Sequence, residues 1–303
     1  MATQLTDDPH RIATAPVVVG VDGSAAADHA VCWAATTAAA RSRRLRLVNG
    51  LDIAAKRGVL GSYDLMIPAV LDSIRRQGGE RVAAARALAL RLEPSLVVET
   101  EVSQSNPAEL LIDRSAAAHL VAIGASGEGA TIRHLGSTLL AVASHGHGSI
   151  VVVRGTEWSP DSTAPVVVGV DGSAAGEVAL GAAFAEARDR NARLVAVHVW
   201  SDLHFDRFAG FSGTITDPTV AAEAHALLAT QLSGWHDKYP EVVVTSEVYL
   251  SGPRHYLLEW SKAAQLVVVG SRGRGGFRGL LLGSTSNALV QRAHCPVQVV
   301  HAS

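Results

Sequence analysis

The chain has 303 residues, and at about 150 residues per domain this length predicts two domains. Lysine and arginine number 26 and aspartate and glutamate 28, so the charge gives no broad basic field for nucleic acid. No apolar run reaches the ~20 residues that cross a bilayer, which excludes a membrane-spanning helix. No signal peptide is visible between Met1 and Ala15, so we expect a cytoplasmic protein.

One segment occurs twice, with the sequence Ala-Pro-Val-Val-Val-Gly-Val-Asp-Gly-Ser-Ala-Ala at Ala15–Ala26 and at Ala164–Ala175. An identical repeat of this kind indicates that the chain is a tandem repeat of one module. Each copy reads as a buried strand, a turn that carries an aspartate and the start of a helix. The predicted organisation is a disordered tail over 1–14, a first domain over 15–154, a linker over 155–163 and a second domain over 164–303.

In the first module, apolar runs rich in β-branched residues alternate with helical segments, as strands buried on both faces do. Ser24 and Asn106 are suited to cap helices, and Ile53–Ile67 is expected to be a glycine-containing connection. The predicted strands are Val17–Val21, Leu45–Leu51, Leu96–Val102, His119–Gly124 and Ile150–Arg154. The predicted helices run from Ser24 to about Arg41, over Pro68–Leu92, from Pro107 and over Ser137–Ser144.

The second module repeats this order, and alternating strands and helices imply right-handed crossovers and parallel sheets covered on both faces. We therefore predict an α/β fold whose ligands lie at the carboxyl ends of the strands. Trp33, Trp200, Trp235 and Trp260 are expected in the cores, with Cys32 and Cys295 as small buried residues. The strands are predicted at Val166–Val170, Arg193–Trp200, Val242–Tyr249, Leu266–Gly270 and Val297–Val300, and helices start near Ser173, Asp217, Pro253 and Ser284.

A glycine-rich loop follows the fourth strand of each module. Glycines permit close backbone approach, so that several amide N–H groups can face one anion, and a helix that opens with Ser-Thr adds free N–H groups and hydroxyls. The spacing lacks the lysine of the common phosphate loop, and neither G-x-G-x-x-G after the first strand nor G-x-S-x-G occurs. The loops read Gly270-x2-Gly273-x9-Gly283-Ser284-Thr285 and Gly124-x2-Gly127-x8-Gly136-Ser137-Thr138.

Two simpler interpretations stay open for these residues. The glycines would build only a tight surface turn, and Asp22 and Asp171 would be only turn formers, since Asp-Gly-Ser suits a turn. Nucleotide contact is favoured because each loop follows a strand, opens a helix and recurs together with the aspartate turn. The histidines His134, His145 and His147 show no geometry that would aim them at one metal, so no metal site is expected.

With these motifs, the chain resembles a tandem universal stress protein of the ATP-binding type found in actinobacteria. The second loop matches the family motif G-x2-G-x9-G-[S/T], and the resemblance covers Pro16 to His301. It implies five-stranded sheets of order 3-2-1-4-5 in an adenine-nucleotide alpha-hydrolase-like fold, and ATP as the ligand. The nucleotide-binding residues that it implies are Gly20, Asp22, Gly50, Ile123, Gly124, Gly127, Gly136, Ser137 and Thr138 in the first module, and Gly169, Asp171, Val199, Val269, Gly270, Gly273, Arg274, Gly283, Ser284 and Thr285 in the second.

The first module departs from the family pattern. Its loop is one residue shorter, and Ser126 and Glu128 stand where the second module has Arg272 and Arg274. An inward-facing Glu128 would repel a triphosphate. We therefore expect tighter binding in the second module.

The resemblance implies a stress-response regulator or nucleotide sensor that binds ATP, with Mg²⁺ entering with the nucleotide. An ATP hydrolase or transferase is the first alternative, although the sequence supplies no evident general base and no catalytic lysine. A nucleotide-free interaction module is the second. The two modules are expected to pair through their last strands as an intramolecular pseudo-dimer, and whether two chains form a homodimer stays open.

Overall fold

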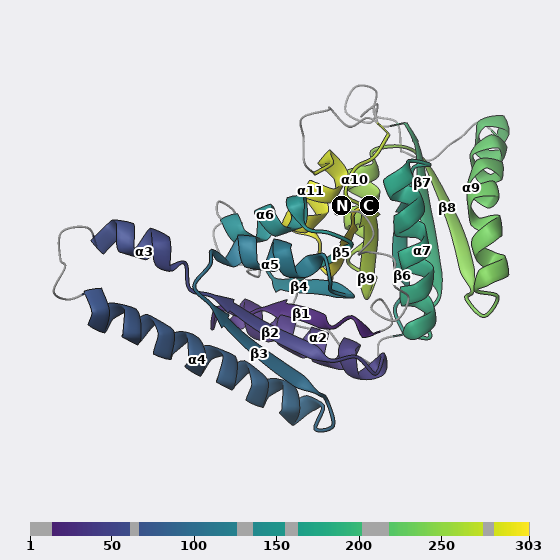
Figure 1. The fold of residues 1–303 in the computed structure, drawn as a ribbon. Coiled ribbons are helices and arrows are strands. Elements are labelled where there is room, and N and C mark those ends of the chain that lie inside the picture. Colours follow the sequence, from purple (N-terminus) through teal and green to yellow (C-terminus); the bar gives the residue numbers. More distant parts are fainter. Residues whose placement is uncertain are drawn as a thin grey trace, which may run out of the picture. The chain divides into compact units, whose positions relative to one another are not determined.

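The computed structural model describes residues 14–60, 67–125, 136–154, 163–201, 218–274 and 282–302. The chain divides into two compact units, Met1–Thr156 and Glu157–Ser303, called unit 1 and unit 2 here. Each unit is one parallel sheet with helices on both faces (Figure 1).

Unit 1 has the strand order β3-β2-β1-β4-β5, and its paired strands are parallel. Helices α2 and α4 pack together on one face of the sheet, and α5 and α6 pack together on the other (Figure 1). The strands are β1 (Val17–Gly20), β2 (Leu45–Gly50), β3 (Val98–Ser103), β4 (Leu120–Gly124) and β5 (Ser149–Val153). The helices are α2 (Ala25–Ala40), α3 (Ile53–Leu60), α4 (Ile67–Leu92), α5 (Pro107–Ser115) and α6 (Ser137–His145).

Unit 2 repeats this topology with the order β8-β7-β6-β9-β10. Both sheets therefore confirm the predicted order 3-2-1-4-5. The strands are β6 (Val166–Val170), β7 (Leu194–Ser201), β8 (Val244–Ser251), β9 (Leu266–Gly270) and β10 (Val297–Val300). The helices are α7 (Ala174–Asp189), α9 (Pro218–Lys238), α10 (Pro253–Trp260) and α11 (Ser284–Arg292).

The central strands are buried on both faces, as their β-branched sequences predict. The three valines of β1 are at most 1% exposed, and β9 is buried along its whole length. In unit 2, Phe184 of α7 stacks on Trp235 and Tyr239 of α9, with ring centroids 6.1 and 5.7 Å apart. These aromatic contacts join the two helices that cover the same face of the sheet.

Three sequence predictions are wrong. Cys32 was expected to be buried, but it is half-buried. Ile53–Ile67 was expected as a connection, but Ile53–Leu60 forms helix α3. Its first residue is buried beside Leu51 and Leu71, and this packing outweighs the helix-weakening glycine at position 58. Trp33 is fully buried as predicted, but Trp200 is 40% exposed. Strand alternation predicts which face of the sheet Trp200 lies on, but not whether another element covers that face.

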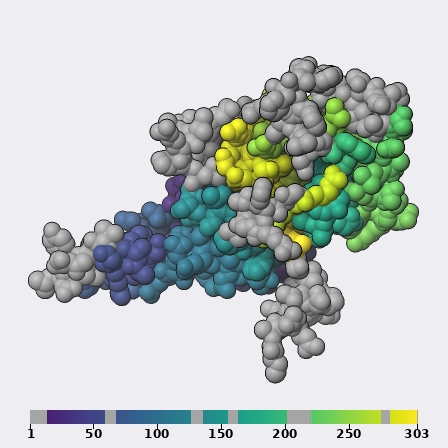
Figure 2. Space-filling view, turned by 90° about the horizontal axis from the view of Figure 1, so that it is seen from above, coloured from purple at the N-terminus to yellow at the C-terminus, as the bar shows by residue number. Residues whose placement is uncertain are grey.

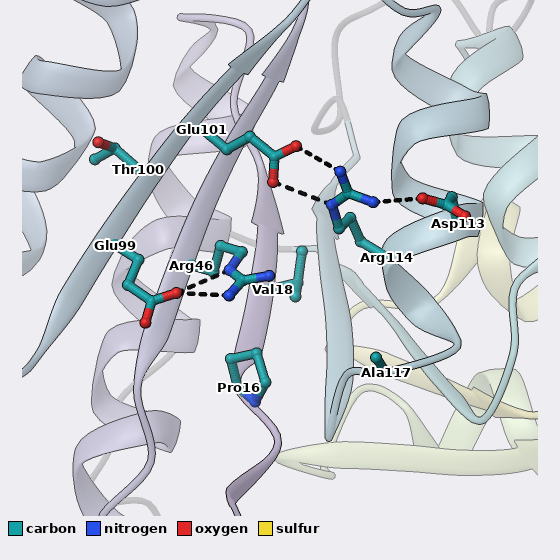
Figure 3. Close-up of a pocket in the computed structure, with 9 residues that line it drawn as sticks. All are labelled: Pro16, Val18, Arg46, Glu99, Thr100, Glu101, Asp113, Arg114 and Ala117. Atoms are coloured by element: carbon teal, nitrogen blue, oxygen red, sulfur yellow. Dashed lines mark hydrogen bonds and ion pairs between the residues drawn. The ribbon is translucent and has the colours of Figure 1, made fainter. Parts of the chain in front are cut away.

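A concavity of about 530 Å³ lies over β2, β3 and α5 of unit 1 (Figure 3). Its two arginines are both engaged by carboxylates. Arg46 donates two hydrogen bonds of 2.9 and 2.7 Å to Glu99. Arg114 donates one hydrogen bond to each carboxylate oxygen of Glu101, at 3.1 and 2.8 Å. These bonds hold the pKa of both carboxyl groups below their ordinary value, despite some opposition from burial.

The lowered pKa of Glu101 makes the stability of unit 1 depend on pH. Its stabilising effect is present above the unfolded pKa of about 4.5 and is lost as pH falls through the lower folded pKa. Glu101→Gln should therefore lower the free energy of unfolding by about 0.5–1 kcal/mol at about pH 7 and by much less at about pH 3. Urea titrations at both pH values test this, with Asp72→Asn on the more exposed Arg75–Asp72 pair as the control. A loss of equal size at both pH values would contradict it.

Candidate functional site

Each unit has the same tight turn at the carboxyl end of its first strand. Gly23 and Gly172 have φ values of 84° and 73°, a left-handed conformation that glycine adopts without strain. The preceding aspartate accepts the serine N–H two residues on at 2.9 Å, in the first unit from Ser24 and in the second from Ser173. Asp22 and Asp171 are therefore turn formers, whatever else they bind.

The serine of each turn caps the following helix, as predicted. Ser24 Oγ accepts the N–H of Ala27 at 3.2 Å, and Ser173 Oγ accepts the N–H of Gly176 at 3.0 Å. The turn and the first helical turn thus form one hydrogen-bonded segment, and the aspartate has a fixed place at its start.

A buried side chain of the second strand holds the residue just before each aspartate. Asn49 donates its amide N–H to the carbonyl of Val21, and His198 Nδ1 lies 2.8 Å from the carbonyl of Val170. A carbonyl only accepts, so the proton of this histidine lies on Nδ1. Both side chains are at most 3% exposed and follow their carbonyl by 28 residues. Two different residues therefore perform one anchoring role at equivalent positions.

At four of the predicted glycines, the strand backbone lies in close contact with a neighbouring helix. A Cβ at Gly20 or Gly169 would lie 2.9 or 3.0 Å from a leucine of α5 or α10. A Cβ at Gly124 would lie 2.0 Å from the carbonyl oxygen of Ala26, and one at Gly270 would lie 2.8 Å from the backbone of Ala175. The ends of β4 and β9 therefore pack directly on the first turns of α2 and α7, which gives these glycines a packing role besides any ligand contact.

The predicted base-binding residues line the same strand ends. Ile123, Val199 and Val269 are between 4% and 7% exposed. Gly50 allows a close helix contact, because a Cβ there would lie 2.7 Å from Cα of Pro107. The equivalent Val199 carries a side chain, so the two units differ where β2 and β7 end.

The described parts of the unit 2 loop join at its base. The N–H of Ser271 donates to the carbonyl of Val300, and the N–H of Gly283 donates to the carbonyl of Ser271, both at 2.8 Å. Ser286 Oγ donates to the carbonyl of Gly270 at 2.6 Å. These bonds place the start of α11 beside the end of β9. The segment that contains α11, yellow in Figure 2, lies at the surface.

The helices after both loops begin without a side-chain cap. Gly283 precedes α11 and Gly136 precedes α6, and neither cap position supplies a side-chain hydrogen bond. Ser284 and Ser137 are exposed, and Thr285 and Thr138 are half-buried. Their uncapped N–H groups and hydroxyls are the donors that an anion would use.

Asp171 connects the aspartate turn of unit 2 to its glycine loop. Its Oδ2 accepts the backbone N–H of Arg274 at 3.1 Å, and a Cβ at Gly273 would lie 2.5 Å from this oxygen. The side chains of Arg272 and Arg274 are exposed. The structure thus brings together Asp171, Gly273, Arg274 and the start of α11, as the sequence predicts for one site.

The sequence did not predict the side chains that lie over the two turns. A Cβ at Gly23 would lie 3.2 Å from Cγ and 3.3 Å from Nε of Arg81 on α4. At Gly172 the neighbour is Gln231 Nε2 of α9, at 2.9 Å. Among the described residues, the side chain nearest the turn glycine is therefore a cation in unit 1 and a neutral amide in unit 2. No local sequence motif predicts this position of Arg81, because only the packing of α4 brings it to the turn.

Part of the predicted site lies outside the described residues. Gly127, Ser126 and Glu128 of the first loop fall there, so their contribution to the site stays a prediction. Within the described ranges, no group of three or more His, Cys, Asp or Glu side chains could hold a metal ion. No helix in these ranges is both long and apolar enough to cross a membrane.

Sequence comparison identifies the fold that carries this site. The universal stress protein family model matches residues 14–154 and 163–301. The chain belongs to the universal stress protein family. It is 40% identical over 286 residues to a universal stress protein of Mycolicibacterium smegmatis, covering 94% of this chain and 96% of that one. A universal stress protein of Mycobacterium tuberculosis is 37% identical over 295 residues, covering 95% and 97%.

Solved structures agree with this fold. A universal stress protein from Archaeoglobus fulgidus superposes with a TM-score of 0.68 at 16% identity, covering 96% of this chain and 98% of that one. The chain is thus a universal stress protein with two family domains in tandem, and its family is one of stress-response proteins.

The shared anchoring role of His198 and Asn49 can be tested by exchange. His198→Leu should lower the free energy of unfolding by about 1–3 kcal/mol, because the carbonyl of Val170 loses its buried donor. His198→Asn should lose less, since unit 1 already uses an asparagine at this place. Chemical unfolding of both variants, with Asn49→Leu as the matched change in unit 1, measures this. Equal losses for the leucine and asparagine variants would show that the donor is unimportant.

Proposed function

We propose that this universal stress protein binds ATP at the carboxyl ends of its strands and acts as a stress-response regulator or nucleotide sensor in the cytoplasm. The observation that carries the proposal is the meeting of Asp171, the backbone of Gly273 and Arg274, and the uncapped start of α11. A carboxylate acceptor beside free backbone donors suits a ligand with both hydroxyl and phosphate groups.

The described residues are better suited to bind a triphosphate than to catalyse its hydrolysis. Backbone N–H groups, Ser284 and Thr285 are donors for phosphate oxygens, and Mg²⁺ would enter with the nucleotide. Asp171 is committed to three hydrogen bonds within the protein, so it is poorly placed as a free general base. Slow ATP hydrolysis is the enzyme alternative, and a nucleotide-free interaction module is the other. Nucleotide extracted from the purified protein separates them: ATP supports binding, ADP supports hydrolysis and none supports the third.

We expect unit 2 to bind more tightly than unit 1. Its loop matches the family spacing, and its arginines lie on the loop itself, where charge-assisted contacts to phosphate are about twice as strong as neutral ones. Arg81 works in the opposite direction, because it supplies unit 1 with a cation near Asp22. The ranking therefore depends on loop geometry outweighing this single charge.

Replacing Gly273 should abolish ATP binding at the second site. A side chain at this position enters the space beside Asp171, where its Cβ would already be 2.5 Å from Oδ2. Isothermal titration of Gly273→Val with ATP measures the loss. Gly234→Ala on α9 is the control, because a Cβ there meets nothing within 4 Å. Unchanged ATP binding in the valine variant would refute a phosphate site at this loop.

The two aspartates should contribute unequally. Asp171→Ala should weaken ATP binding by at least the ~0.5–1.5 kcal/mol of one hydrogen bond, and the remaining affinity should be that of unit 1. Asp22→Ala should leave the tighter site intact. Calorimetric titration of both variants, with thermal unfolding to confirm that each is folded, measures the difference. Equal residual affinities, or a larger loss from Asp22→Ala, would contradict the ranking.

A further inference from the structure

We propose that Asp171 is a positioning residue that holds the start of the glycine loop of unit 2, Gly273 and Arg274, in place before any nucleotide arrives. The inference rests on the proposed function only in taking this loop as the phosphate-binding element. The holding contact is the hydrogen bond from the N–H of Arg274 to Oδ2 of Asp171, at 3.1 Å.

The two oxygens of Asp171 divide their partners between two segments of the chain. Oδ1 accepts the N–H of Ser173 at 2.9 Å and its hydroxyl at 2.6 Å, which keeps the carboxylate within its own turn. Oδ2 is thereby directed away from the turn, toward the loop after β9. The carboxylate is half-buried, so its attraction for the loop N–H is only partly weakened by water.

Two glycines make the space for this carboxylate. A Cβ at Gly176 of α7 would lie 2.5 Å from Oδ1, and a Cβ at Gly273 would lie 2.5 Å from Oδ2. The helix and the loop therefore both approach Asp171 at backbone distance. The glycine at the start of the loop motif thus serves an internal acceptor, in addition to any ligand phosphate.

The contact fixes one end of the loop, while the other end is fixed by the bond from Gly283 to Ser271. Both described ends of the loop are thus attached to the rest of unit 2 before binding, so the ligand does not have to fix them. A carboxylate oxygen accepts more than one hydrogen bond, so Oδ2 can keep the N–H of Arg274 when a ligand hydroxyl approaches.

Asp171→Asn separates this role from the turn. The asparagine carbonyl oxygen can replace Oδ1 as acceptor for Ser173, but its NH₂ group cannot accept from Arg274. In the full-length, nucleotide-free protein, amide hydrogen exchange measured by NMR should become about ten- to a hundredfold faster at Arg274, as expected for a lost hydrogen bond to a charged group. The amide of Asn287 in α11, which bonds Gly283, should keep its rate.

A second variant reaches the same contact from the other side. Gly273→Ala keeps the carboxylate but displaces Oδ2, so it should also speed exchange at Arg274. This variant decides the question if Asp171→Asn does not fold. Asp22→Asn in unit 1 is the matched control and should leave the Arg274 rate unchanged.

An unchanged rate at Arg274 in the folded variants would overturn the positioning role, as would equal acceleration at Arg274 and Asn287. A titration of the wild-type protein with ATP keeps the two hypotheses apart. Faster exchange at Arg274 in the variants, with no ATP binding by the wild type, would support the positioning role and refute the proposed function.

Discussion

The architecture of each candidate site depends on one buried hydrogen bond beside the end of the first strand. The carbonyl of Val21 or Val170, at the end of the first strand, belongs to a buried residue, where an unmade hydrogen bond is costly. A side chain from the neighbouring strand meets it, and the chain can then turn sharply. The aspartate, the left-handed glycine and the capping serine follow in fixed positions because the strand end is fixed.

Helix packing and ligand binding both require residues without a side chain at the glycines of the site. At Gly124 and Gly270, the strand that leads into the loop lies against the backbone of a helix that begins at the aspartate turn. In unit 2 this contact places the described start of the glycine loop beside the aspartate turn. A substitution that affects ligand binding at these positions would therefore also affect folding.

Much of the fold could be predicted from the sequence, since continuous valine runs and their alternation with helices specify the parallel sheets. The turns and their caps were predictable because the signals are local. Helix α3, the exposure of Trp200 and the approach of Arg81 were not, because each depends on segments distant in the sequence. The same holds for the Arg114–Glu101 pair: the alternation of β3 places Glu99 and Glu101 on one face, but only the packing of α5 brings Arg114 to it.

The closed base of the second loop has a consequence for its tolerance to change. The bonds from Ser271 to Val300 and from Gly283 to Ser271 close the loop at its base. Added residues beyond Arg274 would lengthen a ring whose closing entropy grows only with the logarithm of its length. Natural or engineered insertions there, including a short sequence that carries a fluorescent label, would leave β9 and α11 in register. The one-residue difference between the two loops of this chain is a small change of that kind.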